Sequence, residues 1–524
     1  MSIHKWTLVV LLVMLYVIGS SFSSEDKEKL IPIQLLGVND FHGQLETSRT
    51  VDGKQVGGAG YLAAYVKKVK KENVPSLLVH AGDMVGGSAP LSALKQDEPT
   101  IEFMNRLGFD VGTVGNHEFD EGVEEMKRLL NGGKHEKTGE FGGATFPYTV
   151  ANVIDTETNE PILPPYVIKK VNGIPIGFIG IVTTETKYIV LPKGIKGLKF
   201  KDEVASINET VQDLKRKGVR SIVVLAHVSA SSEMDGSRPS QELVDFAPLI
   251  DDEVDVIFGG HNHRHANTTV NGKLIVESYS YGTAFSNVNI KIDPKTKDIV
   301  EKEANIVRTF HEGIEPDQEI LKMVRTYGKG QNKLLNEVVG HSEETFTKHK
   351  SVSGERTLGS ILADSNRETM GADFGFMNPG GIRADLDKGD ITWGKLYTML
   401  PFGTNLVKMD VTGAQIKEIL EQQWTGNFQT ILQPSGLHFT WKKNAAHGEK
   451  IASLTKEDGK PISPENTYSI AITNYLATGG DGFTAFKKGT NVVNGPLTLD
   501  SFISYIHKNT GSLKQPEGNR IALK

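Results

Sequence analysis

The chain has 524 residues, a formal net charge of −6 and no cysteine. This length is too great for one hydrophobic core and predicts about two to four domains. The acidic balance argues against nucleic acid or an anionic membrane as the main partner. The lack of cysteine excludes disulfides, thiolate metal sites and a lipid anchor on cysteine. The contents of apolar and charged residues are those of an ordinary soluble globular protein.

The first residues form a pattern typical of a secretory signal. Lys5 precedes an apolar run over residues 8–18, and small residues follow that run. The run is shorter than the roughly 20 residues that a membrane span needs. We therefore expect residues 1–23 to be a cleaved signal peptide, with an uncleaved N-terminal anchor as the alternative. Export without cysteine favours a secreted, periplasmic or cell-envelope protein of bacteria, with no stable membrane anchor after cleavage.

Residues 24–313 are predicted to form the first domain, because short apolar runs alternate with helical patterns there. β-branched and apolar residues dominate residues 31–38, 76–79, 111–114, 176–182, 221–225 and 254–258. Apolar residues recur at helical spacing over residues 61–74, 98–107 and 204–217. This alternation predicts an α/β domain around a buried sheet.

Side chains that can bind metal follow five of these runs, each at the point where a strand is expected to end. Open α/β sheets place their ligands at this edge. Five strand ends that all deliver such groups are hard to explain by chance. His80 and His265 are left out: we expect His80 to be structural and His265 to be a solvated loop residue. The seven candidate ligands are Asp40, His42, Asp83, Asn116, His227, His261 and His263.

Seven ligands are too many for one ion and fit two ions that share a bridging carboxylate. Imidazole with carboxylate and carboxamide oxygen favours Zn²⁺, Mn²⁺, Co²⁺ or Fe over Mg²⁺ or Ca²⁺. Two such ions about 3.5–4 Å apart activate a water and clamp the oxygens of a phosphoryl group. His117 precedes Asp120 by three residues, so the carboxylate can hold the imidazole in its charged form near developing negative charge. The pattern predicts metal-assisted phosphoester hydrolysis.

Residues 314–339 are predicted to be a helix that links two domains. Pro316 stands at the first turn, and Ile320 and Val324 recur at helical spacing, while Gly328 and Gly330 interrupt the pattern. An ordinary surface helix is the alternative. Residues 340–524 then have an α/β pattern of their own, which predicts a second domain.

Three glycine-containing loops stand out in this second domain, over residues 378–383, 401–403 and 474–483. Phe402 and Tyr475 lie on two of them and could clamp a planar ring, with core packing as the alternative. The guanidinium of Arg383 could donate paired hydrogen bonds to phosphate or ribose oxygens, although a lone arginine is more often a surface residue. Thr412 and Gln415 predict a capping box at the start of a helix.

The strings at residues 38–43, 81–83, 115–120 and 259–263 resemble the calcineurin-like metallophosphatases. More narrowly, they resemble the secreted 5′-nucleotidase family, which includes periplasmic UDP-sugar hydrolases and animal ecto-5′-nucleotidases. The resemblance implies an N-terminal sandwich of two sheets flanked by helices, joined by a linker helix to an α/β nucleotide-binding domain. It also implies one metal ion on Asp40, His42, Asp83 and His263, and another on Asp83, Asn116, His227 and His261.

The resemblance further assigns roles to single residues. His117 and Asp120 correspond to a catalytic pair, Phe402 and Tyr475 would sandwich the base, and Asp481 would bind the ribose hydroxyls. Contacts to the nucleotide would come from Asn378 and Arg383. Some members have glutamine where this chain has His263. The chain departs from the family at two positions, with Val352 and Thr404 where an arginine and an asparagine are common. Arg356, Lys350 and Asn405 lie close to the last two positions.

These observations predict a secreted, two-metal 5′-nucleotidase that cleaves nucleoside 5′-monophosphates such as AMP to nucleoside and phosphate. One alternative is an apyrase-like, UDP-sugar or 2′,3′-cyclic nucleotide hydrolase that uses the same site. Another is a catalytically inactive nucleotide-binding surface protein. The expected partner is a small-molecule nucleotide and not a nucleic acid polymer. The sequence predicts neither the metal in vivo nor the oligomeric state.

Overall fold

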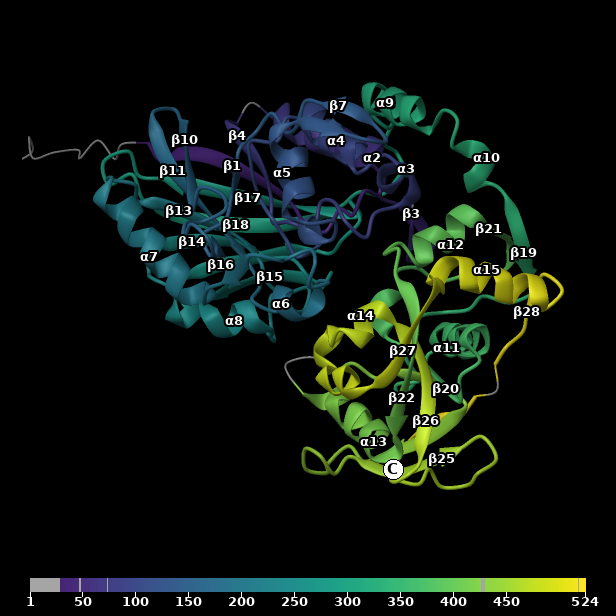
Figure 1. Ribbon diagram of the computed structural model, residues 1–524. Helices are drawn as coiled ribbons and strands as arrows, with labels where there is room; N and C mark the ends of the chain where they lie inside the picture. Colours follow the sequence, from purple (N-terminus) through teal and green to yellow (C-terminus); the bar gives the residue numbers. More distant parts are fainter. Residues whose placement is uncertain (1–28, 47–48, 73, 426–428, 517) are drawn as a thin grey trace, which may run out of the picture.

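The computed structural model describes residues 29–46, 49–72, 74–425, 429–516 and 518–524, so the predicted signal peptide lies outside the described residues. Figure 1 shows two lobes, one coloured purple to teal and the other green to yellow. Between them run α9 (Gln318–Gly328) and the short α10 (Asn332–Leu335). The predicted linker is therefore two helices, because the chain is extended at Lys329 and left-handed at Gly330. The domain boundaries at 313 and 339 remain predictions.

The first lobe is a sandwich of two six-stranded sheets. One has the order β18 (Ile299–Arg308), β17 (Ala284–Ile292), β1 (Ile31–Val38), β4 (Ser76–His80), β5 (Val111–Thr113) and β8 (Tyr148–Thr149). The other has the order β10 (Tyr166–Val171), β11 (Ile174–Val182), β13 (Ser221–His227), β14 (Val254–Phe258), β16 (Lys273–Ser278) and β15 (His265–Val270). Strands β1, β4 and β5 are parallel to one another, as are β11, β13 and β14.

Apolar side chains of the two sheets meet in one core. Leu35 and Val79 of the first sheet pack in the same cluster as Phe178 and Val256 of the second. Because both faces of β13 are buried, its sequence is a nearly unbroken apolar run. Helices α2 (Ala59–Lys70), α4 (Glu98–Leu107) and α5 (Val123–Asn131) pack on the first sheet, and α7 (Glu203–Arg216) and α8 (Glu242–Phe246) pack on the second. The short helices α3 (Pro90–Ala93) and α6 (Thr186–Ile189) contact the second lobe. The predicted sandwich of two sheets flanked by helices is confirmed.

Three short two-stranded sheets complete this lobe. They pair β2 (Arg49–Val51) with β3 (Lys54–Val56), β6 (Gly133–His135) with β7 (Gly139–Phe141), and β9 (Val153–Asp155) with β12 (Leu198–Phe200).

The second lobe has a mixed five-stranded sheet and two three-stranded sheets. The large sheet has the order β23 (Gln433–Ser435), β20 (Phe374–Met377), β26 (Thr467–Thr473), β22 (Asn405–Thr412) and β27 (Thr490–Leu497). The small sheets are β21 (Gly389–Thr392), β19 (Val338–Ser342) and β28 (Ser512–Leu513), and β25 (Ile451–Lys456), β24 (Leu437–Trp441) and β29 (Ile521–Leu523). The helices are α11 (Thr357–Met370), α12 (Trp393–Met399), α13 (Gly413–Glu421), α14 (Asn474–Ala477) and α15 (Thr498–Lys508). The predicted capping box of Thr412 and Gln415 is present at the start of α13.

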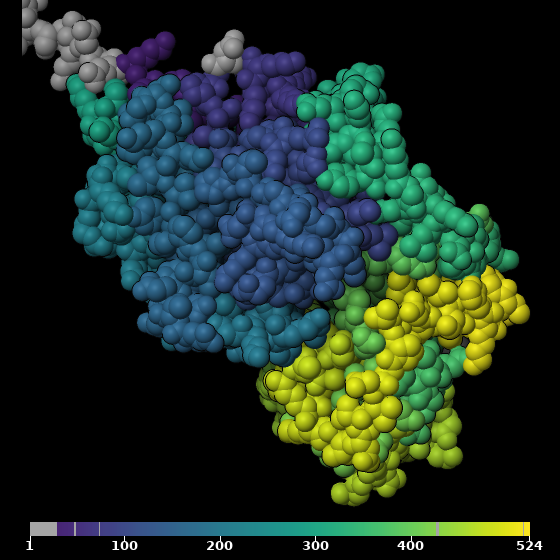
Figure 2. All heavy atoms as spheres, turned by 45° about the horizontal axis from the view of Figure 1, so that its top comes forward, coloured from purple at the N-terminus to yellow at the C-terminus, as the bar shows by residue number. Residues whose placement is uncertain are grey.

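The two lobes touch along a seam, where the blue atoms of the first meet the green and yellow atoms of the second in Figure 2. Helix α3 contacts α12, and α6 contacts the short turn η5 (Gly480–Gly482). Within the part of the chain that the structure describes, every helix is too short or too polar to cross a bilayer.

Candidate metal centre and nucleotide pocket

The seven predicted metal ligands converge beyond the carboxyl ends of the parallel strands. In each of two groups of three, the ligand atoms lie within 4.8 Å of one another: Asp40, His42 and His263, and Asp83, His227 and His261. Asn116 joins the second group, with its Oδ1 3.1 Å from Nε2 of His227. Asp83 lies between the groups, its Oδ2 being 3.7 Å from His42 Nε2 and 3.1 Å from His227 Nε2. The structure thus brings all seven together, and their binding of metal stays a prediction.

Hydrogen bonds on the Nδ1 atoms of two imidazoles show that their Nε2 atoms are available to bind a metal ion. His42 Nδ1 lies 2.8 Å from the carbonyl oxygen of Gly86, and His227 Nδ1 lies 2.9 Å from that of Ala81. A carbonyl only accepts, so each Nδ1 carries the hydrogen and each Nε2 presents a lone pair to the cluster. Ligating histidines are commonly oriented by such a bond on the other ring nitrogen.

The ionisation of the first group also suits a cation. Burial lowers the pKa of His263 to about 4, against the opposing effect of Asp40, so this imidazole is neutral. Burial alone would raise the pKa of Asp40, but His263 and His227 outweigh it and lower that pKa to about 2. The oxygen of Asp40 and Nε2 of His263 lie 3.3 Å apart. A carboxylate and neutral imidazoles converge here, which is the set that Zn²⁺, Mn²⁺ or Co²⁺ prefers.

The backbone at these positions is unusual. Asp40, His42, Asp83, His261 and His263 all have a positive φ, between 49° and 83°. Such conformations cost free energy in residues other than glycine and cluster at functional sites.

One glycine is needed for close packing beside these ligands. A Cβ atom on Gly115 would lie 2.2 Å from Oδ1 of Asp83 and 2.8 Å from Nδ1 of His227. Any larger residue would therefore displace two of the ligands.

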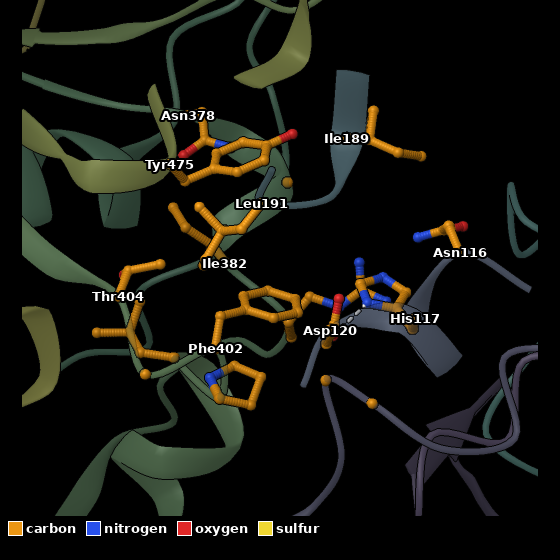
Figure 3. Close-up of a pocket in the computed structure, with 18 of the residues that line it drawn as sticks. Asn116, His117, Asp120, Ile189, Leu191, Asn378, Ile382, Phe402, Thr404 and Tyr475 are labelled. Carbon is orange, nitrogen blue, oxygen red and sulfur yellow. Dashed lines mark hydrogen bonds and ion pairs between the residues drawn. The ribbon is translucent and has the colours of Figure 1, made fainter. Parts of the chain in front are cut away.

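His117 and Asp120 form the predicted pair beside this cluster. His117 begins a short 3₁₀ turn, η1 (His117–Phe119), and Asp120 follows it, with His117 Nδ1 2.8 Å from Asp120 Oδ2 (Figure 3). The His117 ring centre is 5.0 Å from that of His42. Burial disfavours the charged imidazolium, but the carboxylates of Asp120 and Asp83 outweigh burial and raise the pKa of His117. Asp120 thus favours the charged form of His117, whose Nε2 is directed away from Asp120.

The predicted substrate residues divide into two groups, the first of which is joined by hydrogen bonds. The Tyr475 hydroxyl donates to Asp481 Oδ1 at 2.6 Å, and the Asn378 amide donates to Asp481 Oδ2 at 2.8 Å. The three residues are therefore fixed relative to one another. Figure 3 shows Tyr475 and Asn378 together on one side of the pocket.

The second group, Phe402 and Arg383, lies against the metal centre. The Phe402 ring stacks on the His117 ring, with centres 5.5 Å apart and planes 14° apart. Arg383 places Nη2 3.3 Å from His42 Nε2 and its guanidinium carbon 5.7 Å from the centre of the Phe402 ring. Both groups line one cavity of about 1560 Å³ together with His117 and His263.

The residues at the two departures from the family motif have different surroundings. Val352 is 89% exposed and does not line the cavity, whereas Arg356 and Lys350 do. The Thr404 and Thr498 hydroxyls lie 3.0 Å apart, and the Asn405 amide donates to the Gly495 carbonyl at 3.2 Å. Asn405 is therefore partly engaged within its own domain.

Two buried glutamates that hold the ligand loops together were missed by the sequence analysis. Glu118 accepts hydrogen bonds from the backbone N–H groups of Asp83 at 3.0 Å and Met84 at 2.8 Å, and from that of Gly115. It thereby ties the loop after β4 to the loop after β5. Burial and the nearby Asp83 raise the pKa of Glu118 to about 7. Its signal in the sequence is a carboxylate between two motif residues, His117 and Phe119.

Glu277 on β16 makes the matching connection in the second sheet. It accepts from the N–H groups of Ala230 at 3.0 Å and Arg264 at 2.9 Å, and so joins the loops after β13 and β14. Burial and Asp40 raise its pKa well above the usual value. Its signal is a lone acidic residue in the apolar run of residues 274–278.

Two histidines that were left out of the ligand set are both buried. His80, which was predicted to be structural, packs with its ring 4.9 Å from that of Tyr148. The prediction that His265 is a solvated loop residue is wrong, because it begins β15 and is 8% exposed. Its ring packs 5.6 Å from that of Tyr279.

Comparison with known proteins places the chain in a family. Residues 33–265 match the family described as calcineurin-like phosphoesterase, and residues 338–488 match the 5′-nucleotidase C-terminal domain. Cell wall protein Lmo0130 of Listeria monocytogenes is 36% identical over 94% of this chain and 69% of its own length. The 5′-nucleotidase precursor from Thermus thermophilus superposes with a TM-score of 0.82, at 27% identity over 94% of this chain and 99% of that one.

The fold and the cluster of ligand atoms are those of the class of metal-dependent phosphoesterases. The chain belongs to the 5′-nucleotidase family of calcineurin-like phosphoesterases. Endonuclease YhcR of Bacillus subtilis is 42% identical over 94% of this chain. The chain spans only 41% of the length of YhcR, so the activity in that name does not transfer directly.

Proposed function

We propose that this protein is a 5′-nucleotidase that hydrolyses nucleoside 5′-monophosphates such as AMP to nucleoside and phosphate. The observation that carries the proposal is the position of His117, which lies between the cluster of ligand atoms and the ring of Phe402. His117, which is suited to phosphoryl chemistry, therefore lies next to the flat ring of Phe402, which is suited to contact a base or sugar. Residues 24–313 would supply the first and residues 340–524 the second.

In this proposal the seven ligands hold two divalent ions, with Asp83 as the bridge. Bound there, the ions would supply Lewis acidity, which lowers the pKa of a water and neutralises charge on phosphoryl oxygens. His117, whose charged form Asp120 favours, would donate a hydrogen bond to the phosphoryl group or the leaving oxygen as charge develops. Zn²⁺, Mn²⁺ and Co²⁺ are the ions that this donor set favours.

The second domain would hold the nucleoside. Tyr475 and Phe402 would contact the base, and Asp481, already oriented by Tyr475 and Asn378, would accept from the ribose hydroxyls. Arg383, 3.3 Å from His42, is placed to meet the phosphate.

We also propose that the protein acts in the cell envelope or outside the cell. The apolar run of residues 8–18 supports export, and the relative Lmo0130 is named a cell wall protein. Its partner would be a free nucleotide.

Chromatographic identification of the products, together with phosphate release, tests the proposal on a panel of substrates, because cleavage of a UDP-sugar, a cyclic nucleotide or an oligonucleotide liberates no inorganic phosphate directly. The panel is AMP, ADP, ATP, UDP-glucose, 2′,3′-cyclic AMP and a single-stranded DNA oligonucleotide, each with Mn²⁺ or Zn²⁺ and with chelator. We expect chelator-sensitive release from AMP. A higher kcat/KM on ADP or UDP-glucose would contradict the assignment to monophosphates and support the alternative hydrolases. Cleavage of the oligonucleotide alone would replace the proposal by a nuclease activity.

A further inference from the structure

Four cationic side chains are linked near the metal centre: Arg383 and Arg49 lie on its His42 side, Lys348 contacts Arg383, and Arg356 contacts Lys348. Among the residues that the structure describes, none of the four has a carboxylate oxygen within 4.0 Å. The Nε atoms of the three arginines are buried and have no hydrogen-bond partner. Burying cations without a counterion is costly, so a protein keeps such a group when a ligand supplies the negative charge.

Lys348 lies at the centre of this group and is held in place through its backbone. Its N–H donates to Asp385 Oδ1 at 2.8 Å, and its carbonyl accepts from the guanidinium of Arg356. Its ammonium donates to the Arg383 carbonyl at 3.2 Å, a neutral acceptor that leaves further N–H groups free. Burial lowers the pKa of Lys348, and Arg383 and Arg49 add to this effect against Tyr281 and Asp385.

The position of the cations relates them to the reacting group. Lys348, Arg356 and Arg383 all line the cavity that also contains His117 and Phe402. Arg383 is the one nearest the metal centre, at 3.3 Å from His42.

Arg49 lies behind Tyr281 and adds positive charge to the same side of the centre. Its guanidinium carbon is 3.8 Å from the centre of the Tyr281 ring, and that ring centre lies 5.7 Å from the ring centre of His42.

We propose that Lys348 is a specificity-determining residue that, together with Arg356, binds a second anionic group of the substrate, such as the second phosphate of a nucleoside diphosphate. The inference rests on the proposed function, because it takes a nucleotide to be bound beside His117 and Phe402. A single phosphoryl group at the metal centre has Arg383 and the ions as its counter-charges. Among the described residues the further cations have no carboxylate within ion-pair distance, the carboxylate that acts on Arg49 and Lys348 being that of Asp385 from further away, and a second phosphate would supply a close counter-charge.

The test compares AMP and ADP in wild type and Lys348→Ala, with Lys350→Ala as the matched control. Lys350 is exposed, lies two residues away and lines the same cavity. We expect Lys348→Ala to lower kcat/KM for ADP by about tenfold or more, the scale of a lost hydrogen bond to a charged group. The variant should change kcat/KM for AMP by less than about threefold, Lys348→Arg should restore ADP turnover, and Lys350→Ala should alter neither. An equal fall for both substrates, or no fall for ADP, would overturn the proposal.

A binding measurement separates this inference from the proposed function. Titration of the metal-loaded protein with inorganic pyrophosphate and with inorganic phosphate needs no nucleotide turnover. Lys348→Ala should weaken pyrophosphate binding more than phosphate binding even if AMP is not a substrate. Unchanged pyrophosphate affinity in a variant whose thermal unfolding matches wild type would reject a second anion site, whatever the nucleotide assays show.

Discussion

The site residues of the two domains differ in how they are positioned. In the first domain the predicted residues lie together, because each metal ligand lies at or shortly after the end of a strand in a two-sheet sandwich whose core is shared. In the second domain the predicted residues lie on loops and divide, with Tyr475 and Asp481 bonded to each other and Phe402 packed on His117. The strand ends of the first domain thus position the candidate metal ligands. The packing of the second domain on the first brings the candidate nucleotide-binding residues to them.

The largest effect is expected from His117→Ala. Loss of a donor aimed at developing charge should lower kcat for AMP by about 10²–10³-fold. The number of metal ions per chain should not change, because His117 is a neighbour of the proposed ligands and not one of them. Steady-state kinetics together with elemental analysis checks this, and a variant that has also lost its metal would show that His117 serves the centre as a ligand.

Substitution of Tyr475 and Phe402 tests whether these two residues have different roles, since Tyr475 is bonded to Asp481 and Phe402 packs on His117. Tyr475→Ala should mainly raise KM, by about tenfold, since stacking on a base contributes about 1–3 kcal/mol. Phe402→Ala should change kcat as well as KM, because its ring also packs on His117. Tyr475→Phe, which keeps the ring and removes the hydroxyl that bonds Asp481, is the control. Identical effects of Tyr475→Ala and Phe402→Ala on kcat would contradict these different roles.

The buried glutamates test how the first domain holds its ligands. Glu118→Ala leaves the N–H groups of Asp83 and Met84 without their acceptor, and an unsatisfied buried group costs about 1–3 kcal/mol. Urea unfolding of the metal-free protein should show a loss on this scale, larger than that of Glu118→Gln, which keeps one acceptor oxygen. Glu277→Ala should behave alike. Unaltered stability with unaltered metal affinity would mean that these bonds do not position the ligands.

The smallest predicted effect concerns pH. Burial raises the pKa of Asp481 above its ordinary value, against the hydrogen bonds from Tyr475 and Asn378. The carboxylate form accepts from ribose hydroxyls, so KM for AMP should rise as the pH falls through this raised pKa, while kcat is less affected. In Asp481→Asn the KM should be higher at neutral pH and flat over the same acid range. A wild-type KM that does not rise as the solution is made more acidic would exclude this role.

Much of the first domain could be predicted from sequence because its signals are local. A strand followed by Asn116 and His117 specifies both an element and the edge at which its ligands lie, so the α/β sandwich and the grouping of the seven ligands were accessible. Glu118 and Glu277 were not, because their role depends on backbone groups of other loops. His265 was misplaced because the packing of Tyr279 over it is a tertiary contact.

In the second domain the residue types were recognisable and their neighbours were not. Nothing in the loop sequence indicates that Phe402 contacts His117 or that Arg383 reaches His42, since both contacts cross between domains. The same limit applies to Lys348, which is one of several lysines in its segment until burial distinguishes it from Lys350.

The most direct test of a two-ion phosphoester hydrolase is to count metal ions and AMP turnover together in wild type, His42→Ala and His227→Ala. We predict two divalent ions per wild-type chain, fewer in each variant, and loss of phosphate release in parallel with the ions. Full AMP hydrolysis by a protein that contains no divalent metal would contradict the account.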